Sequence, residues 1–145
     1  MNKKNKILPE VHIQSIFALY SNSQFQEALA TIKALIKYYP NDPWLYNISG
    51  VCYKSINQLD SAVQSFEKAL SIKSDDIKAC FNLGIIYMEI GQLDTAVKFY
   101  EKVLALNLNH TDAQYNLAIT FEALGQLDAA VKSYEKVLAR KPDHF

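Results

Sequence analysis

The sequence GQLDTAVKFYEKVLALNLNH, residues 91–110, returns almost unchanged at residues 125–144 as GQLDAAVKSYEKVLARKPDH. A looser copy, NQLDSAVQSFEKALSIKSDD, begins at Asn57, and a fainter one, SQFQEALATIKALIKYYP, begins at Ser23. The four phrases start 34 residues apart. A fixed period of this length indicates a chain built from copies of one small unit that is stable only next to its neighbours.

Each period contains two segments with helical periodicity. Within the phrase from Gly91, apolar residues such as Val97, Tyr100 and Leu104 recur every three or four positions and form one stripe. The segments between the phrases (44–56, 78–90 and 112–124) each carry a small residue followed three positions later by an aromatic one. Asp42 and Pro43 have the residue types of a helix cap and a first helical position. Gly91 and Gly125 can adopt the positive φ that a tight turn between two helices requires.

These features together resemble the tetratricopeptide repeat family. They are the 34-residue period, the small residue and aromatic of the first helix, the turn glycine, and an alanine followed four positions later by an aromatic in the second helix. The resemblance implies an all-α fold, an α-solenoid forming a right-handed superhelix of about four antiparallel helix pairs. It divides the chain into a tail at 1–8, a degenerate repeat at 9–42, and repeats at 43–76, 77–110 and 111–144. A coiled coil is the structural alternative, but turn signals in every half-period argue against it.

The first repeat departs from this pattern at three positions. Ile16 stands where glycine or alanine is usual, Leu19 where the aromatic is usual, and Ser23 where the turn glycine is usual. We expect two helices here as well, with packing that differs from that of the other repeats.

Gly84 lies in the middle of a predicted helix, where glycine costs roughly 1 kcal/mol relative to alanine. Such a cost indicates that the partner helix passes too close for a larger side chain. An alanine occupies one equivalent place in every second helix, and we expect these alanines to form the other side of the contact: Ala28, Ala62, Ala96 and Ala130.

Composition excludes several functional classes. Lys plus Arg equals Asp plus Glu, at 15 each, so the basic face of a nucleic-acid binder is not expected. No apolar run is long enough to span a bilayer, and the lysines at the start precede no apolar signal region. We therefore expect a cytoplasmic protein that contacts neither nucleic acid nor membrane. Cys52 and Cys80 lack metal-ligand spacing and are interpreted as small buried hydrophobic residues.

Catalysis by this segment is not expected. The three histidines are His12, His110 and His144, and the last two lie in predicted turns with no nucleophile placed beside them. No phosphate-binding glycine loop or metal-ligand spacing occurs. Asp75 and Asp76 are interpreted as the start of a helix, where negative charge is favourable. The sequence therefore predicts a protein that is not an enzyme, with no catalytic residue, metal or cofactor.

The resemblance implies that the first helices line a concave groove that holds a peptide or a partner segment, so that the protein acts as an interaction scaffold. Trp44 is expected to be an exposed anchor on one continuous surface with the other groove residues, while Phe81 and Tyr115 could instead pack against neighbouring helices. Ile13, Phe17 and Tyr20 would extend the groove into the first repeat. Its expected lining consists of Trp44, Asn47, Val51, Lys54, Lys78, Phe81, Asn82, Ile85, Met88, Tyr115, Asn116, Ile119 and Glu122.

The polar residues of this set bear on the ligand. A carboxylate clamp, which some family members use, requires lysines, asparagines and an arginine at inward positions. Of these required residues only one asparagine, Asn82, is present, so a clamp is not expected. Arrays attached to nucleocytoplasmic sugar transferases carry a ladder of asparagines that binds peptide backbone amides. Asn82 and Asn116 match this ladder, whereas Asn47 is one residue out of phase.

The last phrase keeps its apolar stripe although no further repeat follows it in this sequence. Val131, Tyr134 and Leu138 are therefore expected to form an exposed apolar face. Two alternatives remain open. The natural chain could continue past Phe145, as the recruitment segment of a larger enzyme such as a sugar transferase, or this end could associate with another copy.

Overall fold

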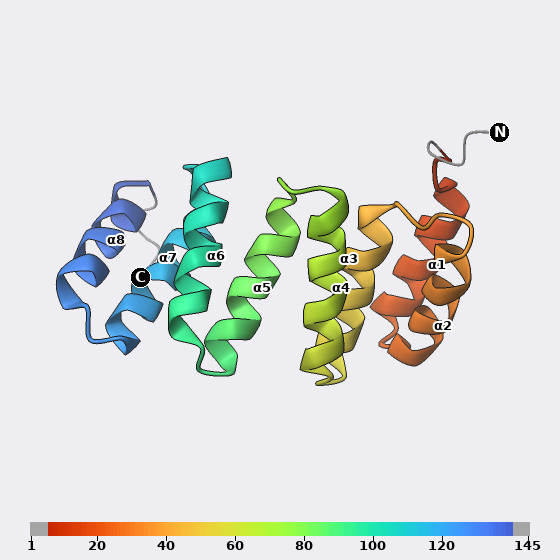
Figure 1. Ribbon diagram of the computed structural model, residues 1–145, viewed down its shortest axis with the longest axis horizontal. Coiled ribbons are helices and arrows are strands. Elements are labelled where there is room, and N and C mark those ends of the chain that lie inside the picture. The colour runs from red at the N-terminus through yellow and green to blue at the C-terminus, as the bar shows by residue number, and fades with distance from the viewer. Residues whose placement is uncertain (1–5, 141–145) are drawn as a thin grey trace. The chain divides into compact units, whose positions relative to one another are not determined.

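The computed structural model describes residues 6–140, which form eight α-helices and no strand (Figure 1). The chain divides into two compact units, residues 1–76 and 77–145. Residues 1–5 of the expected tail, and Lys141 and His144, lie outside the described residues. The all-α prediction is confirmed. The first unit contains α1 (Glu10–Ser21), α2 (Phe25–Ile36), α3 (Pro43–Ser55) and α4 (Leu59–Ile72), and the second α5 (Ile77–Glu89), α6 (Leu93–Leu106), α7 (Thr111–Ala123) and α8 (Leu127–Arg140).

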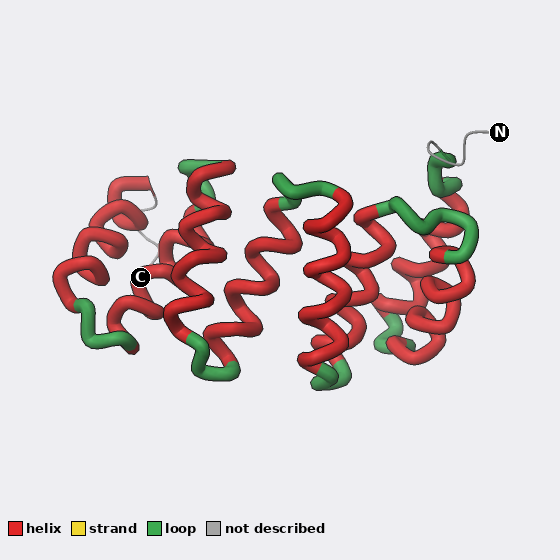
Figure 2. The backbone as a smooth tube through the Cα atoms, in the orientation of Figure 1, coloured by secondary structure: helices red, strands yellow, loops and turns green. Residues whose placement is uncertain are grey.

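The turns inside the four helix pairs share one backbone conformation, and Figure 2 shows them as short loops. In each turn a glutamine N–H donates to the carbonyl five residues earlier at 2.9 Å, and the residue before the glutamine has a positive φ. This is the Schellman arrangement that ends a helix. The predicted positive φ of Gly91 and Gly125 is confirmed at 82° and 74°. Ser23 and Asn57 adopt the same conformation, both with φ 59°, without the freedom of glycine.

Side chains cap the N-termini of α3 and α7, which are each the first helix of a pair. At α3 the Asp42 carboxylate accepts hydrogen bonds from the backbone N–H groups of Trp44 and Leu45, at 2.9 and 3.4 Å, and Pro43 is the first helical residue. The predicted cap is confirmed. His110 occupies the equivalent position before α7, where its Nδ1 accepts from the Ala113 N–H at 3.1 Å.

The close helix approach predicted at Gly84 is confirmed, but the predicted partner is wrong. A Cβ added at Gly84 would lie 2.7 Å from the Tyr100 ring, and one at Gly50 would lie 2.6 Å from the Phe66 ring. The alanines are fully or almost fully buried, yet the aromatic rings form the contact. Side chains on a helix lean toward its N-terminus, so an aromatic four residues after the alanine reaches back over this turn.

The core of the first unit includes Ile16 and Ile32, which are 0% and 1% exposed and belong to one hydrophobic cluster. Cys52 lies in the same cluster and Cys80 lies in α5, and both are completely buried, as the sequence predicted. Burial raises the pKa of the Cys52 thiol to about 11, because a thiolate is poorly solvated there.

Candidate interaction surfaces

The thirteen residues predicted to line a groove lie on α3, α5 and α7, and none of them is fully buried. Lys78 and Glu122 are exposed and the other eleven are half-buried. We call the members on α3 the first-helix face of the first unit, and those on α5 and α7 the first-helix face of the second unit.

Trp44 is half-buried, which makes it less exposed than the sequence predicted. Its ring centroid lies 5.6 Å from that of Phe17, and the two planes are tilted by 52°. Trp44 also packs against the core cluster of the first unit, while Phe17 is 48% exposed. The two rings therefore present a shared aromatic surface, with Phe17 as the more accessible member.

Asn47 has its amide held in one orientation. Its Nδ2 donates to the Asp76 carboxylate at 2.7 Å and to the Pro43 carbonyl at 3.2 Å. Its Oδ1 is buried and accepts no hydrogen bond. Asn47 thus links the start of α3 to Asp76, at the end of the first unit.

Phe81 and Tyr115 both pack against other helices of the second unit and remain partly exposed. The Phe81 ring lies 4.8 Å from the ring of His110 and 6.1 Å from that of Tyr100. Tyr115 meets Tyr134 edge to face at 6.0 Å. Packing against neighbouring rings and partial exposure, which the sequence left as alternatives, therefore occur together at both residues.

Two other residues of this face have polar partners inside the unit. The Met88 sulfur lies 3.4 Å from the Thr120 hydroxyl, which donates its proton to the Asn116 carbonyl at 2.7 Å, and 4.0 Å from the Tyr100 hydroxyl, which can donate to it. Glu122 accepts a 2.8 Å hydrogen bond from the Tyr134 hydroxyl. The polar ends of Met88 and Glu122 are thus engaged with the protein itself.

The asparagines predicted to form a ladder differ in their surroundings. Asn82 donates from Nδ2 to the Lys78 carbonyl at 2.9 Å, one turn earlier in α5. Burial raises the pKa of Tyr100, and the Asn116 side chain, which hydrogen-bonds to the Tyr100 hydroxyl, partly offsets this rise. Asn82 therefore lies along its own helix, whereas Asn116 is tied to the core.

Tyr134 occupies the position in α8 that Tyr100 has in α6. Burial raises its pKa to about 12, and its hydrogen bond to the Glu122 carboxylate acts in the same direction. The hydroxyl is therefore a protonated donor at neutral pH. Tyr134 is half-buried, while Val131 and Leu138 of the expected C-terminal face are 54% and 42% exposed.

The structure also contains two grooves that the sequence did not predict, on the side of the second helices. The α2–α4 groove lies over α3, has a volume of about 640 Å³, and is lined by residues that include Tyr53 and Ser65. The α6–α8 groove lies over α7, measures about 480 Å³, and includes Phe121 and Ser133 in its lining. A sequence signal for them exists, because Ser65 and Ser133 stand where the intervening repeat has Phe99.

Residues 6–140 contain neither a metal-ligand cluster nor a membrane-spanning helix. No group of three or more His, Cys, Asp or Glu side chains in this range could hold a metal ion. No helix in the same range is long and apolar enough to cross a bilayer.

Comparison with known proteins places the chain in a family. A sequence model described as "Tetratricopeptide repeat" matches residues 78–143, and a second, described as "TPR repeat", matches residues 50–91. The two matches together span residues 50–143. The chain belongs to the tetratricopeptide repeat family.

Individual relatives agree with this assignment. The chain is 26% identical over 83 residues to the peroxisomal targeting signal receptor of Candida glabrata, covering 57% of this chain and 14% of the receptor. It is 32% identical over 65 residues to the receptor of Candida albicans, covering 45% of this chain and 11% of that protein. The chain therefore spans about one seventh or less of the curated relatives it matches.

Solved structures show the same fold. MamA residues 41 to the end from Desulfovibrio magneticus RS-1 align with a TM-score of 0.85 at 21% identity, covering 92% of this chain and 75% of that one. Another MamA crystal structure aligns with a TM-score of 0.82 at 24% identity, covering 94% and 77%. The fold is an α-solenoid, and family and fold together define a protein-interaction module.

Proposed function

We propose that the first-helix faces bind a peptide or a segment of a partner protein. The observation that carries this proposal is the partial exposure of apolar rings and amides on first helices whose other sides are completely buried. On α5, for example, Leu83 and Ile86 are 0% exposed, while Phe81 and Ile85 remain half-buried. Half-exposed aromatic and aliphatic groups with rigid surroundings are typical of binding anchors.

The second unit provides complementary chemistry for an extended peptide. Phe81, Ile85 and Ile119 offer apolar contacts on α5 and α7, and the Asn82 oxygen can accept from a peptide N–H group. Lys78 and Glu122 add one charge of each sign at exposed positions. The curated relatives are named as receptors for a targeting signal, which fits a short segment as the ligand.

A selection from a random peptide display library tests this proposal. Peptides enriched on the wild-type protein are measured against Asn82→Ala/Asn116→Ala, which we expect to weaken binding about tenfold by removing amide contacts. The control is Lys98→Ala/Lys102→Ala, which alters two exposed lysines of the second helix α6. Helical circular dichroism has to remain unchanged in both variants. Binding that is lost only in the α6 variant would assign the ligand to the other side of the molecule.

Self-association through α8 is a second candidate function, because Leu127, Val131 and Leu138 are 62%, 54% and 42% exposed. We propose that this apolar face contacts another copy of the chain. Sedimentation velocity of the wild type and of Val131→Glu/Leu138→Glu provides the test. We expect a concentration-dependent increase in mass that the variant abolishes. A wild type that stays monomeric at high concentration contradicts this second candidate.

A further inference from the structure

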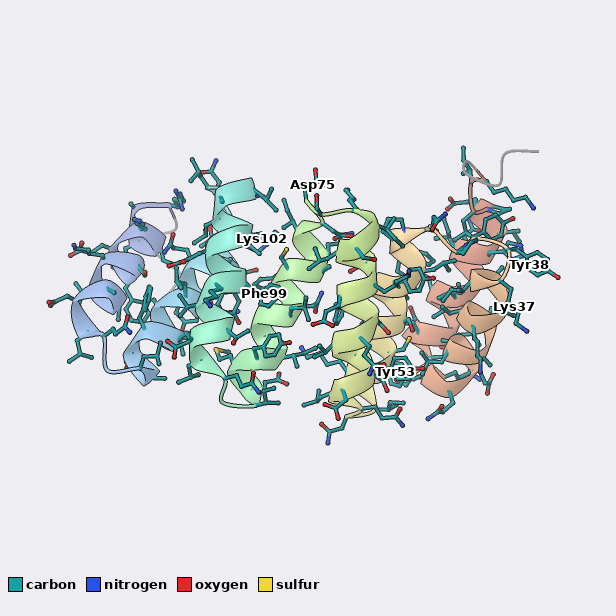
Figure 3. All side chains as sticks on the ribbon, in the orientation of Figure 1. Lys37, Tyr38, Tyr53, Asp75, Phe99 and Lys102 are labelled. Carbon is teal, nitrogen blue, oxygen red and sulfur yellow. The ribbon has the colours of Figure 1, made fainter. Side chains whose placement is uncertain are left out.

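One position of the second helix differs in chemistry among the last three repeats. In α6 it is Phe99, whose ring stacks on Tyr87 of α5 with centroids 5.6 Å apart and planes 5° apart. One period earlier the corresponding residues are Tyr53 and Ser65, and one period later they are Phe121 and Ser133. Figure 3 labels Tyr53 and Phe99 on their respective helices. Among the last three repeats, therefore, only the α5–α6 pair has an aromatic residue on both helices at this place.

Where serine replaces the phenyl ring, the partner ring lacks this stacking neighbour, and Tyr53 and Phe121 are half-buried. Both described grooves open at this place, because the α2–α4 groove includes Tyr53 and Ser65 and the α6–α8 groove includes Phe121 and Ser133. The Ser65 hydroxyl donates to the Ser61 carbonyl at 3.0 Å, so it is satisfied within its own helix. The volumes, about 640 and 480 Å³, are in the range of sites that hold a ligand.

Positive charges outnumber negative charges in the lining of both grooves. Lys33 and Lys68 line the α2–α4 groove together with uncharged residues. Lys132, Lys136 and Arg140 line the α6–α8 groove against one carboxylate, Glu101. Because the whole chain has a formal charge of zero, this excess of cations is a local property of the grooves. It favours an acidic partner.

We propose that each groove accepts an aromatic side chain from an acidic peptide segment, seated on Tyr53 or Phe121 as Phe99 is seated on Tyr87. Stacked and edge-to-face aromatic pairs are favourable beyond their buried area, which gives the ring its specificity. The flanking carboxylates of the segment would meet the lysines and the arginine at the rim. Tyr53 and Phe121 belong to α3 and α7 but are not members of the first-helix faces, and most other lining residues come from second helices. The two sites therefore do not depend on peptide binding at the first-helix faces.

The capped pentapeptide Asp-Glu-Phe-Asp-Glu is a suitable probe, titrated by calorimetry up to about 1 mM, a range that detects weak complexes. We expect saturable binding with two sites per chain. The same peptide with alanine in place of phenylalanine should bind at least tenfold more weakly, and so should a version with lysines in place of the acidic residues. Absence of saturation, or equal binding of the alanine peptide, would overturn the proposal.

Variants of the protein locate the sites. Ser65→Phe supplies the missing ring and should leave one site, and Ser65→Phe/Ser133→Phe should leave none. If a filled variant fails to fold, Lys33→Glu/Lys68→Glu replaces Ser65→Phe, and we expect it to weaken the α2–α4 site at least tenfold. Lys102→Glu is the matched control, because Lys102 occupies the position of Lys68 in the pair that Phe99 already fills. An unchanged stoichiometry in the folded double serine variant contradicts the proposal, as does an equal effect of Lys102→Glu.

Discussion

The first two helix pairs, which belong to the same unit, solve one packing problem in opposite ways. Where α3 approaches α4, Gly50 leaves room for the Phe66 ring, and a Cβ at Gly50 would lie 2.6 Å from it. At the equivalent positions of α1 and α2 stand Ile16 and Ile32, both buried. The smallest residue and a large ring in one pair are thus replaced by two residues of intermediate size in the other.

This difference shows that the residues at the two facing positions are matched to each other, while their types vary from pair to pair. Protein interiors are close-packed, so a larger side chain on one helix has to be matched by a smaller one on its partner. Ile16 is therefore no defect of the first repeat when Ile32 is considered with it.

The largest effect is expected for Gly50→Ile, which places the residue of α1 into α3. The new side chain collides with the Phe66 ring, and we expect a loss of about 3 kcal/mol or more in stability. Thermal and urea unfolding measure it. An unchanged midpoint would mean that the helices can move apart at no cost and that the two facing positions need not match.

Adding Phe66→Ile to that variant should recover part of the loss, because α3 and α4 then carry the pair found in α1 and α2. Phe66→Ile alone should cost about 2 kcal/mol through the cavity it leaves. The double variant should be more stable than the sum of the two single effects predicts, by about 2 kcal/mol. A double-mutant cycle checks this coupling. Strict additivity would show that the two positions do not compensate each other.

The helix starts of the two pairs also differ. Asp42 caps α3, whereas α1 follows Pro9 without a side-chain cap, and the residue equivalent to Asp42 is the buried Leu8. Asp42→Ala should therefore cost about 1 kcal/mol. The exposed Asp60→Ala, in the first turn of α4, is a control with the same change in charge. Equal losses in both variants would indicate a general charge effect rather than a lost cap.

The smallest effect concerns the turn between α1 and α2. Ser23 has a φ of 59°, a conformation that strains side chains other than glycine. We expect Ser23→Gly to stabilise the first unit by about 0.5 kcal/mol, since the relief of strain exceeds the entropy that glycine loses on folding. The reverse change, Gly91→Ser, should destabilise the α5–α6 pair by a similar amount. The measurement is the midpoint of denaturant unfolding, compared between variants that have the same m-value.

Much of this fold follows from periodicity, because apolar spacing, caps and turn residues are local signals. The four helix pairs, the turn conformation of Gly91 and the close approach at Gly84 could be predicted in this way. The identity of the partner ring could not, since it depends on the direction in which a side chain leans across a helix–helix contact. Similarly, Ile16 looks like a departure until its contact helix is known.

The interaction surfaces were predicted less completely. Helical phase places Phe81, Asn82 and Ile85 on a partly exposed side of α5, and the structure agrees with their exposure. The engagement of Met88 with Thr120 involves two helices and has no local signal. The grooves on the second-helix side lie where Ser65 and Ser133 stand in place of a phenylalanine. A comparison that looks only for residues shared by all repeats overlooks such differences.

The two buried cysteines have a practical consequence. Cys52 lies in the first unit and Cys80 in the second, and each is 0% exposed. A thiol reagent can modify either residue only after its surroundings have opened, since both thiols are inaccessible to solvent in the folded protein. The natural sequence therefore carries one reporter of local opening in each half. Their modification rates in the native protein would reveal whether the two halves open together or one at a time.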